Sequence, residues 1–69
     1  MHNIEYVAAK GDLSLTIEPD LEEVGAYLRV YLGTKDVADH LQDSVGKCLE
    51  FALEEYDIPI ESWQERTKV

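Results

Sequence analysis

The chain has 69 residues, of which 45% are hydrophobic, and its 15 acidic and 6 basic side chains give a net charge of −9. This length predicts a single small domain over residues 1–69. The hydrophobic content excludes a disordered acidic tail. The charge disfavours DNA, RNA and anionic lipid, because binding to phosphate needs cations, and it favours a basic protein partner. No segment approaches the roughly 18 apolar residues of a membrane span, and no apolar signal segment is visible, so we expect a cytoplasmic protein.

Residues 4–17 have the pattern of a β-hairpin. Hydrophobic and polar residues alternate strictly in "LSLTI" (residues 13–17), which predicts a half-buried strand. The segment "IEYVAA" (residues 4–9) is the expected partner strand. Between them, Gly11 suits a tight turn with a positive φ.

Residues 20–33 carry signals of both a helix and a strand. For a helix, Asp20 is a suitable N-cap, Glu23 occupies the capping-box position and Gly33 suits the end. For a strand, hydrophobic residues alternate from residue 24 to residue 32, Val and Tyr are good strand formers and weak helix formers, and Gly25 weakens a helix interior. We favour a third strand, because a hairpin alone is marginally stable.

The segment from residue 35 to residue 57 is predicted to be one long amphipathic helix with Thr34 as its N-cap. At 100° per residue, hydrophobic side chains share one arc: Val37, Ala38, Leu41, Val45, Cys48, Leu49, Ala52 and Tyr56. Carboxylates share the opposite arc and would form an acidic ridge about 33 Å long: Asp36, Asp39, Asp43, Glu50, Glu54 and Asp57.

Pro59 is expected to end this helix. The tail then predicts a short edge strand at Ile58–Ile60, with Trp63 either packed on the core or exposed as a contact residue. The expected fold is α+β: a small antiparallel sheet, made of the hairpin and a third strand, packed on one long helix in the order β-β-β-α.

No group of residues predicts catalysis, so we expect no enzyme and no cofactor. The ridge carboxylates would face solvent and stay ionised, whereas acid–base catalysis by paired carboxylates needs pKa values that burial has separated. His2 and His40 lie far apart and Cys48 is the single cysteine, so no metal site is expected.

The acidic ridge has two interpretations. It is either a solvated helix face or a surface that binds a basic protein. Exposed helix faces usually mix signs, because Glu–Lys pairs stabilise a helix and like charges destabilise it, and this face forgoes most of that stabilisation. In a stronger form of the binding hypothesis, the carboxylates imitate nucleic-acid phosphates. The ridge carboxylates are the predicted partner-binding residues, together with three aromatic anchors: Tyr27, Tyr31 and Trp63.

Three short segments resemble the HicB-like antitoxin family: "PDL" at residues 19–21, "GTKDVA" at residues 33–38 and "LEFALEEYDIPIE" at residues 49–61. The resemblance covers roughly residues 4 to 61. It implies a non-catalytic acidic protein that neutralises a small basic ribonuclease toxin. The leading hypothesis is therefore an acidic inhibitor of the antitoxin, immunity or phage anti-defence type, which occludes a basic toxin, nuclease or nucleic-acid-binding effector.

Two alternatives remain at this stage. One is a structural or adaptor module that self-associates as a homodimer, for example through an edge strand near Tyr27, Arg29 and Tyr31. The other is a helix-turn-helix regulator, because "TKDVADHLQDSV" (residues 34–45) has part of that motif's spacing. Its second helix would carry one lysine and four carboxylates, which would repel DNA.

Overall fold

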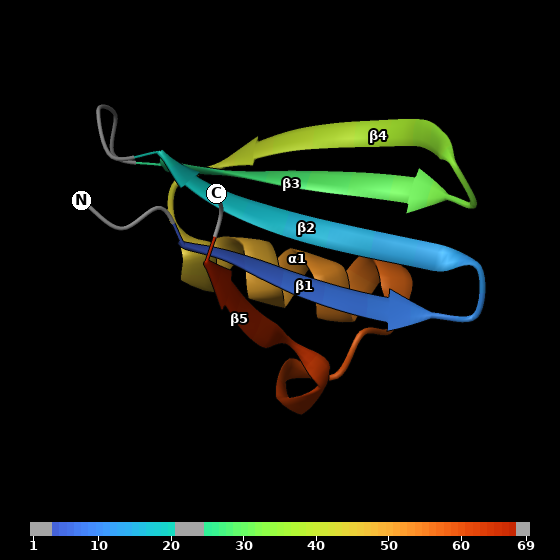
Figure 1. Cartoon of the computed structure of the whole chain (residues 1–69). Helices are drawn as coiled ribbons and strands as arrows, with labels where there is room; N and C mark the ends of the chain where they lie inside the picture. The colour runs from blue at the N-terminus through green and yellow to red at the C-terminus, as the bar shows by residue number, and fades with distance from the viewer. Residues whose placement is uncertain (1–3, 21–24, 68–69) are drawn as a thin grey trace.

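The computed structural model describes residues 4–20 and 25–67 and shows an α+β fold. Its five-stranded antiparallel sheet has the order β4-β3-β2-β1-β5, and α1 lies against one side of it (Figure 1). The elements in chain order are β1 (Ile4–Lys10), β2 (Leu13–Asp20), β3 (Gly25–Leu32), β4 (Lys35–Gln42), α1 (Val45–Tyr56), the 3₁₀ turn η1 (Ile60–Ser62) and β5 (Gln64–Thr67). The predicted fold class and antiparallel sheet are confirmed, and the predicted order β-β-β-α becomes β-β-β-β-α-β.

Two tight hairpins set the register of the first four strands. Gly11 and Gly33 have φ values of +61° and +63°. Each glycine is the first residue of a two-residue loop, because Lys10 pairs with Leu13 and Leu32 pairs with Lys35. A glycine with positive φ at this position is typical of a type II′ turn, whose twist matches that of the flanking strands. The predicted hairpin is confirmed.

The third strand is also confirmed, over Gly25–Leu32. Asp20 is the last residue of β2, and Gly33 belongs to a hairpin loop, so neither marks an end of a helix. Glu23, the predicted capping-box residue, lies outside the described residues.

The prediction of one helix from residue 35 to residue 57 is wrong in its first part. Lys35–Gln42 form β4, and α1 has only 12 residues. The N-cap is Ser44 instead of Thr34, and its Oγ accepts a hydrogen bond from the backbone N–H of Lys47 at 3.2 Å. β4 forms because the far edge of β3 offers a full row of backbone donors and acceptors, and such tertiary pairing overrides local propensity. The helix-turn-helix alternative thereby loses its first helix.

The C-terminal segment also differs from the prediction. Ile58 is a fully buried core residue just after α1 instead of part of an edge strand, and Ile60 begins η1. The edge strand is β5, which pairs antiparallel with β1. α1 ends at Asp57, which has a left-handed backbone conformation (φ 57°), and the N–H of Ile58 donates to the carbonyl of Ala52 at 3.2 Å. A hydrophobic residue after such a cap commonly packs back on the helix.

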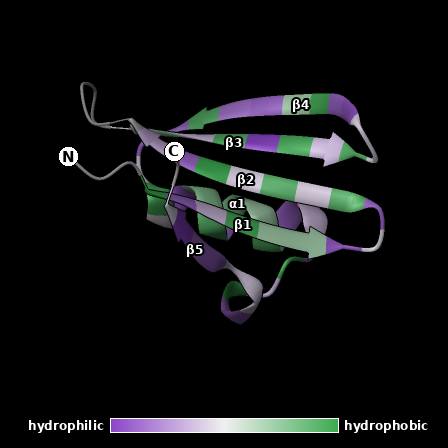
Figure 2. Ribbon diagram, viewed as in Figure 1, coloured by the Kyte–Doolittle hydropathy of each residue, from purple (hydrophilic) through white to green (hydrophobic). Residues whose placement is uncertain are grey.

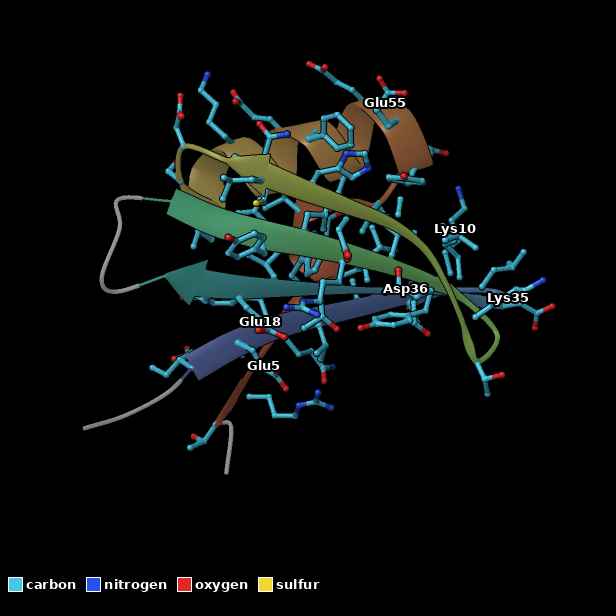
Figure 3. All side chains as sticks on the ribbon, turned by 90° about the horizontal axis from the view of Figure 1, so that it is seen from above. Glu5, Lys10, Glu18, Lys35, Asp36 and Glu55 are labelled. Carbon is cyan, nitrogen blue, oxygen red and sulfur yellow. The ribbon has the colours of Figure 1, made fainter. Side chains whose placement is uncertain are left out.

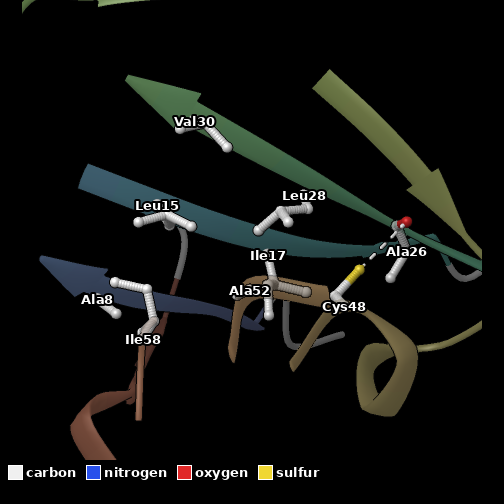
Figure 4. Packing of buried hydrophobic residues seen from close by; sticks show 9 residues of the cluster. All are labelled: Ala8, Leu15, Ile17, Ala26, Leu28, Val30, Cys48, Ala52 and Ile58. Atoms are coloured by element: carbon white, nitrogen blue, oxygen red, sulfur yellow. Dashed lines mark hydrogen bonds between the residues drawn. The ribbon is translucent and has the colours of Figure 1, made fainter. Parts of the chain in front are cut away.

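The core lies between α1 and one face of the sheet. Its buried residues come from β1, β2, β3, α1 and the segment after α1 (Figure 4): Ala8, Leu15, Ile17, Ala26, Leu28, Val30, Cys48, Ala52 and Ile58. Trp63 is half-buried against this cluster, so the core-packing alternative is confirmed for it. In Figure 2 the hydrophobic positions alternate with hydrophilic ones along β2 and β3, whereas β5 is hydrophilic. Alternation of this kind leaves the second face of the sheet polar and accessible.

Candidate protein-binding face

The sheet has one face that α1 does not cover, which we call the open face. In β3, Ala26, Leu28 and Val30 point to the core, so the alternate residues point the opposite way. Figure 3 shows Glu5 and Glu18 on this side of the sheet and Glu55 on the helix side. Within residues 4–20 and 25–67, no helix or strand lies over the open face.

Aromatic, basic, acidic and aliphatic side chains meet on the β3–β4 half of this face. The strand register places Tyr31 beside Asp36, Arg29 beside Asp39 and Tyr27 beside Leu41. Both tyrosines are half-buried, whereas 59% of Leu41 is exposed. We call this set the open-face patch: Tyr27, Arg29, Tyr31, Asp36, Asp39 and Leu41. Tyrosine and arginine are enriched at the centres of protein interfaces, so the patch has the composition of a contact surface.

Arg29 stands among carboxylates at the centre of the patch. Its Nε lies 3.5 Å from Glu18 Oε1, and Asp39 is its cross-strand neighbour on the other side. The Glu18 carboxylate raises the pKa of Arg29 above its usual value, with smaller contributions from Tyr31 and Asp39, and this outweighs the opposing effect of burial. One guanidinium thus faces two carboxylates, and with Asp36 the local charge stays negative.

The β1–β5 half of the open face is held together by a second ion pair. Glu5 is only 6% exposed, and Arg66, its cross-strand neighbour on β5, forms an ion pair with it. Arg66 Nε also donates a hydrogen bond to Glu5 Oε2 at 2.6 Å. Because β5 has no buried side chain, this pair and the backbone ladder attach β5 to the sheet.

A hollow of about 450 Å³ lies beside this pair on the same face. Small or short side chains of β1 and β2 line it, together with two residues of β5: Val7, Ala9, Ser14, Thr16, Gln64 and Arg66. Its charged side chain, Arg66, is already paired with Glu5, and the remaining polar side chains are the hydroxyls of Ser14, Thr16 and Ser62 and the amide of Gln64. The hollow therefore continues the open face as a recess.

The predicted acidic ridge does not form as one line. Asp36 and Asp39 lie on β4 and point to the open face, and Asp43 lies between β4 and α1. The remaining three belong to α1 or its cap, on the other side of the sheet: Glu50, Glu54 and Asp57. The physical reason is that a strand has a period of two and a helix a period of 3.6, so the change at β4 separates residues that a continuous helix would align.

Two of the helix-side carboxylates are ion-paired. Glu50 lies 3.4 Å from Lys47, and Asp57 lies 3.0 Å from Lys10. Of the predicted contact residues, the structure therefore brings four together on the open face: Tyr27, Tyr31, Asp36 and Asp39. Arg29, Glu18 and Leu41 join them: Arg29 was named only for self-association, Leu41 was expected on the hydrophobic arc of the helix, and Glu18 was not predicted. A signal for them was present, because Arg29 alternates with the core residues of a strand that was already favoured.

The described residues hold no group of three or more His, Cys, Asp or Glu side chains placed to bind a metal ion. His40 faces α1, where its ring lies 4.5 Å from that of Phe51 and its Nε2 lies 3.3 Å from the Tyr56 hydroxyl. His40 thus joins β4 to the helix. Neither helical segment in residues 4–20 and 25–67 has the length and hydrophobicity that crossing a bilayer requires.

Comparison of the chain with protein-family models, with curated proteins and with solved structures gives no match.

Proposed function

We propose that the protein is a non-enzymatic acidic inhibitor that binds and occludes a basic protein through its open-face patch. The observation that carries the proposal is the composition of this patch. Two tyrosines and an exposed leucine lie among carboxylates on a sheet face that no described element covers. Aromatic anchors supply most of the binding energy in such surfaces, and unpaired charges at the rim set specificity and the association rate.

The charges of α1 run against the helix dipole and add to the negative field of the protein. The first turn of α1 has no acidic residue and the last turn has no basic residue. Instead, Glu54, Glu55 and Asp57 lie at the C-terminal end, where the helix dipole disfavours anions. Wherever they lie, these carboxylates add to the negative field that attracts a cationic partner at long range.

The family resemblance is compatible with this function and names a partner class, a small basic ribonuclease toxin. The phosphate-mimicry form of the hypothesis required one continuous acidic ridge, which the structure replaces with two separate surfaces, so it is not retained. The self-association alternative relied on an edge at Tyr27–Tyr31. β3 pairs with both β2 and β4, so it has no free edge.

The experiment compares two double variants with the same change in charge. Asp36→Asn/Asp39→Asn removes two carboxylates from the open face, and Glu50→Gln/Glu54→Gln removes two from the helix side. Each variant is tested for inhibition of small basic ribonucleases, with lysozyme as a basic control protein, at 50 and 300 mM NaCl. We expect the first variant to lose at least about tenfold in affinity and the second less than about threefold.

Equal losses in the two variants would show that net charge alone drives binding and that the open face is not the contact surface. Thermal unfolding of both variants checks that each remains folded. Failure of the folded wild-type protein to inhibit any basic ribonuclease at low salt rejects the proposed function itself.

A further inference from the structure

The outer edge of β4 lacks a strand partner within the described part of the chain. β4 is the outermost strand of the sheet on the side away from β5 (Figure 1). Its pairing with β3 is irregular near the hairpin, at Val30 and Tyr31, and regular from Ala38 to Gln42. A regular outer strand presents a row of backbone N–H and C=O groups that another extended chain can pair with.

Side chains on both faces of this edge would contact an added strand. On the open face, Asp39 and the exposed Leu41 project from β4. On the helix face, His40 lies against Phe51 and near Tyr56, so an aromatic group flanks the same edge. An added strand would therefore gain contacts on both faces in addition to the backbone ladder.

Charge decides which kind of strand fits. Asp36 and Asp39 lie on β4 and Asp43 directly follows it, and the only Lys or Arg of β4 is Lys35 at its start. A second copy of β4 would bring these carboxylates close to their counterparts, and each chain carries a net charge of −9. Like charges on neighbouring strands destabilise pairing. A segment with lysine or arginine opposite Asp39 would instead place a cation beside that carboxylate, with Asp36 and Asp43 just beyond the two ends of the regular pairing.

We infer that β4 accepts an extended basic segment of the partner protein as a sixth strand, paired along Ala38–Gln42. This inference rests on the proposed function and specifies how the partner is held. Backbone pairing gives the affinity, and Asp39, with Asp36 and Asp43 beyond the ends of the pairing, favours a cationic segment. The open-face patch then extends without a break onto the added strand.

The test uses two synthetic nine-residue peptides of alternating lysine and valine. One peptide is unmodified, and the other is N-methylated on the backbone at two consecutive central residues. Consecutive N–H groups point to opposite edges of a strand, so neither edge of the methylated peptide can form a continuous hydrogen-bonded ladder. The charge of the two peptides is the same. Both are titrated into ¹⁵N-labelled protein at 50 mM NaCl. We expect the unmodified peptide to bind at least about fivefold more tightly and to slow hydrogen exchange of alternate amides in residues 38–42 at least about tenfold.

Equal affinities, absence of binding by both peptides, or unchanged exchange in β4 overturns the inference. The double variant Asp36→Asn/Asp39→Asn separates the two proposals. If both peptides bind equally and this variant weakens the binding of both, strand addition is ruled out and the open-face proposal stands. If this variant does not change the binding of either peptide, the result counts against the open face as the contact surface. Concentration-dependent dimerisation of the free protein with protection of β4 identifies a second copy as the occupant, which also overturns the inference.

Discussion

Lys10 at the end of β1 and Asp57 at the end of α1 form an ion pair, with 3.0 Å between Nζ and Oδ2. Lys10 Nζ also lies 3.4 Å from the backbone oxygen of Asp57, so it approaches the negative end of the helix dipole. Both side chains are largely exposed, which limits the contribution of the pair to about 0–1 kcal/mol. Lys10 therefore compensates only part of the unfavourable charge that Glu54, Glu55 and Asp57 place at this end of the helix.

Reversing one of these charges should stabilise the protein. We expect Glu55→Lys to raise the free energy of unfolding by about 0.3–1 kcal/mol, because a cation interacts favourably with the C-terminal end of a helix. Urea unfolding at low and high salt measures the effect, which should shrink as salt increases. Glu65→Lys on the exposed strand β5 makes the same change in net charge away from the helix and serves as the control. A larger gain from the control would mean that overall charge repulsion, and not the helix dipole, dominates.

Arg66→Met should destabilise the protein, because it leaves the buried carboxylate of Glu5 without its partner. We expect a loss of about 1–3 kcal/mol in the free energy of unfolding, with faster hydrogen exchange in β5. Adding Glu5→Gln to this variant should restore part of the loss, since a neutral amide is less costly to bury than a charge. The control is Lys47→Met, which breaks the exposed pair with Glu50 and should change stability by less than about 0.5 kcal/mol. Similar losses from the two methionine variants would contradict the structural role of the Glu5–Arg66 pair.

Cys48 should make stability depend on pH above pH 9. Burial raises the pKa of its thiol from 9.0 to about 11 in the folded protein. Between these values the unfolded chain loses the thiol proton while the folded chain keeps it. The contribution of the thiol to stability is therefore constant below pH 9, and it falls by about 1.4 kcal/mol per pH unit between pH 9 and 11.

Other groups also titrate in this range, so the measurement is the difference in unfolding free energy between the wild type and Cys48→Ala from pH 7 to 11. That difference should shrink as the pH rises, and a constant difference would contradict the raised pKa of the buried thiol.

In the folded protein at pH 8, iodoacetamide should react with Cys48 far more slowly than with the denatured chain, because the thiol is buried and its Sγ lies 3.6 Å from the Ala26 carbonyl oxygen.

Alanine at two glycines should have opposite effects. Gly33→Ala has open space for the new methyl group, but its φ of +63° is unfavourable for alanine, so we expect a loss of about 1 kcal/mol. Gly46→Ala places the methyl group 3.7 Å from Ser44 Oγ, an ordinary contact, in the first turn of α1. It should stabilise the protein by up to about 1 kcal/mol, because alanine has the higher helix propensity. Thermal unfolding of both variants is the measurement, and shifts in the same direction would refute the turn geometry.

The hairpin and β3 were predictable because short-range signals determine them. Strict alternation of hydrophobic residues identifies a half-buried strand, and Gly11 between two such segments identifies a turn. The second half of the long helix was predictable for the same reason, since residues 45–56 keep a helical period of hydrophobic side chains. In these segments the local preference and the environment in the folded protein agree.

β4 and β5 could not be recognised in this way. "KDVADHLQ" carries few hydrophobic residues at strand spacing, and its Val and Leu also fit a helix that starts after Thr34. It becomes a strand because the hairpin at Gly33 returns the chain along the unpaired edge of β3. β5 is polar throughout and is held by pairing with β1 and by Arg66 on Glu5, partners that lie about 60 residues away in the chain.

The sequence by itself determined the net negative charge, the fold class and the alternation that separates Tyr27, Arg29 and Tyr31 from the core. Only the tertiary structure decided where the carboxylates lie. Strand pairing placed Asp36 and Asp39 beside the tyrosines and left Glu50 and Glu54 on the other side of the molecule. The physical reason is that hydrogen bonding between strands depends on distant parts of the chain, whereas charge and side-chain periodicity are properties of the local sequence.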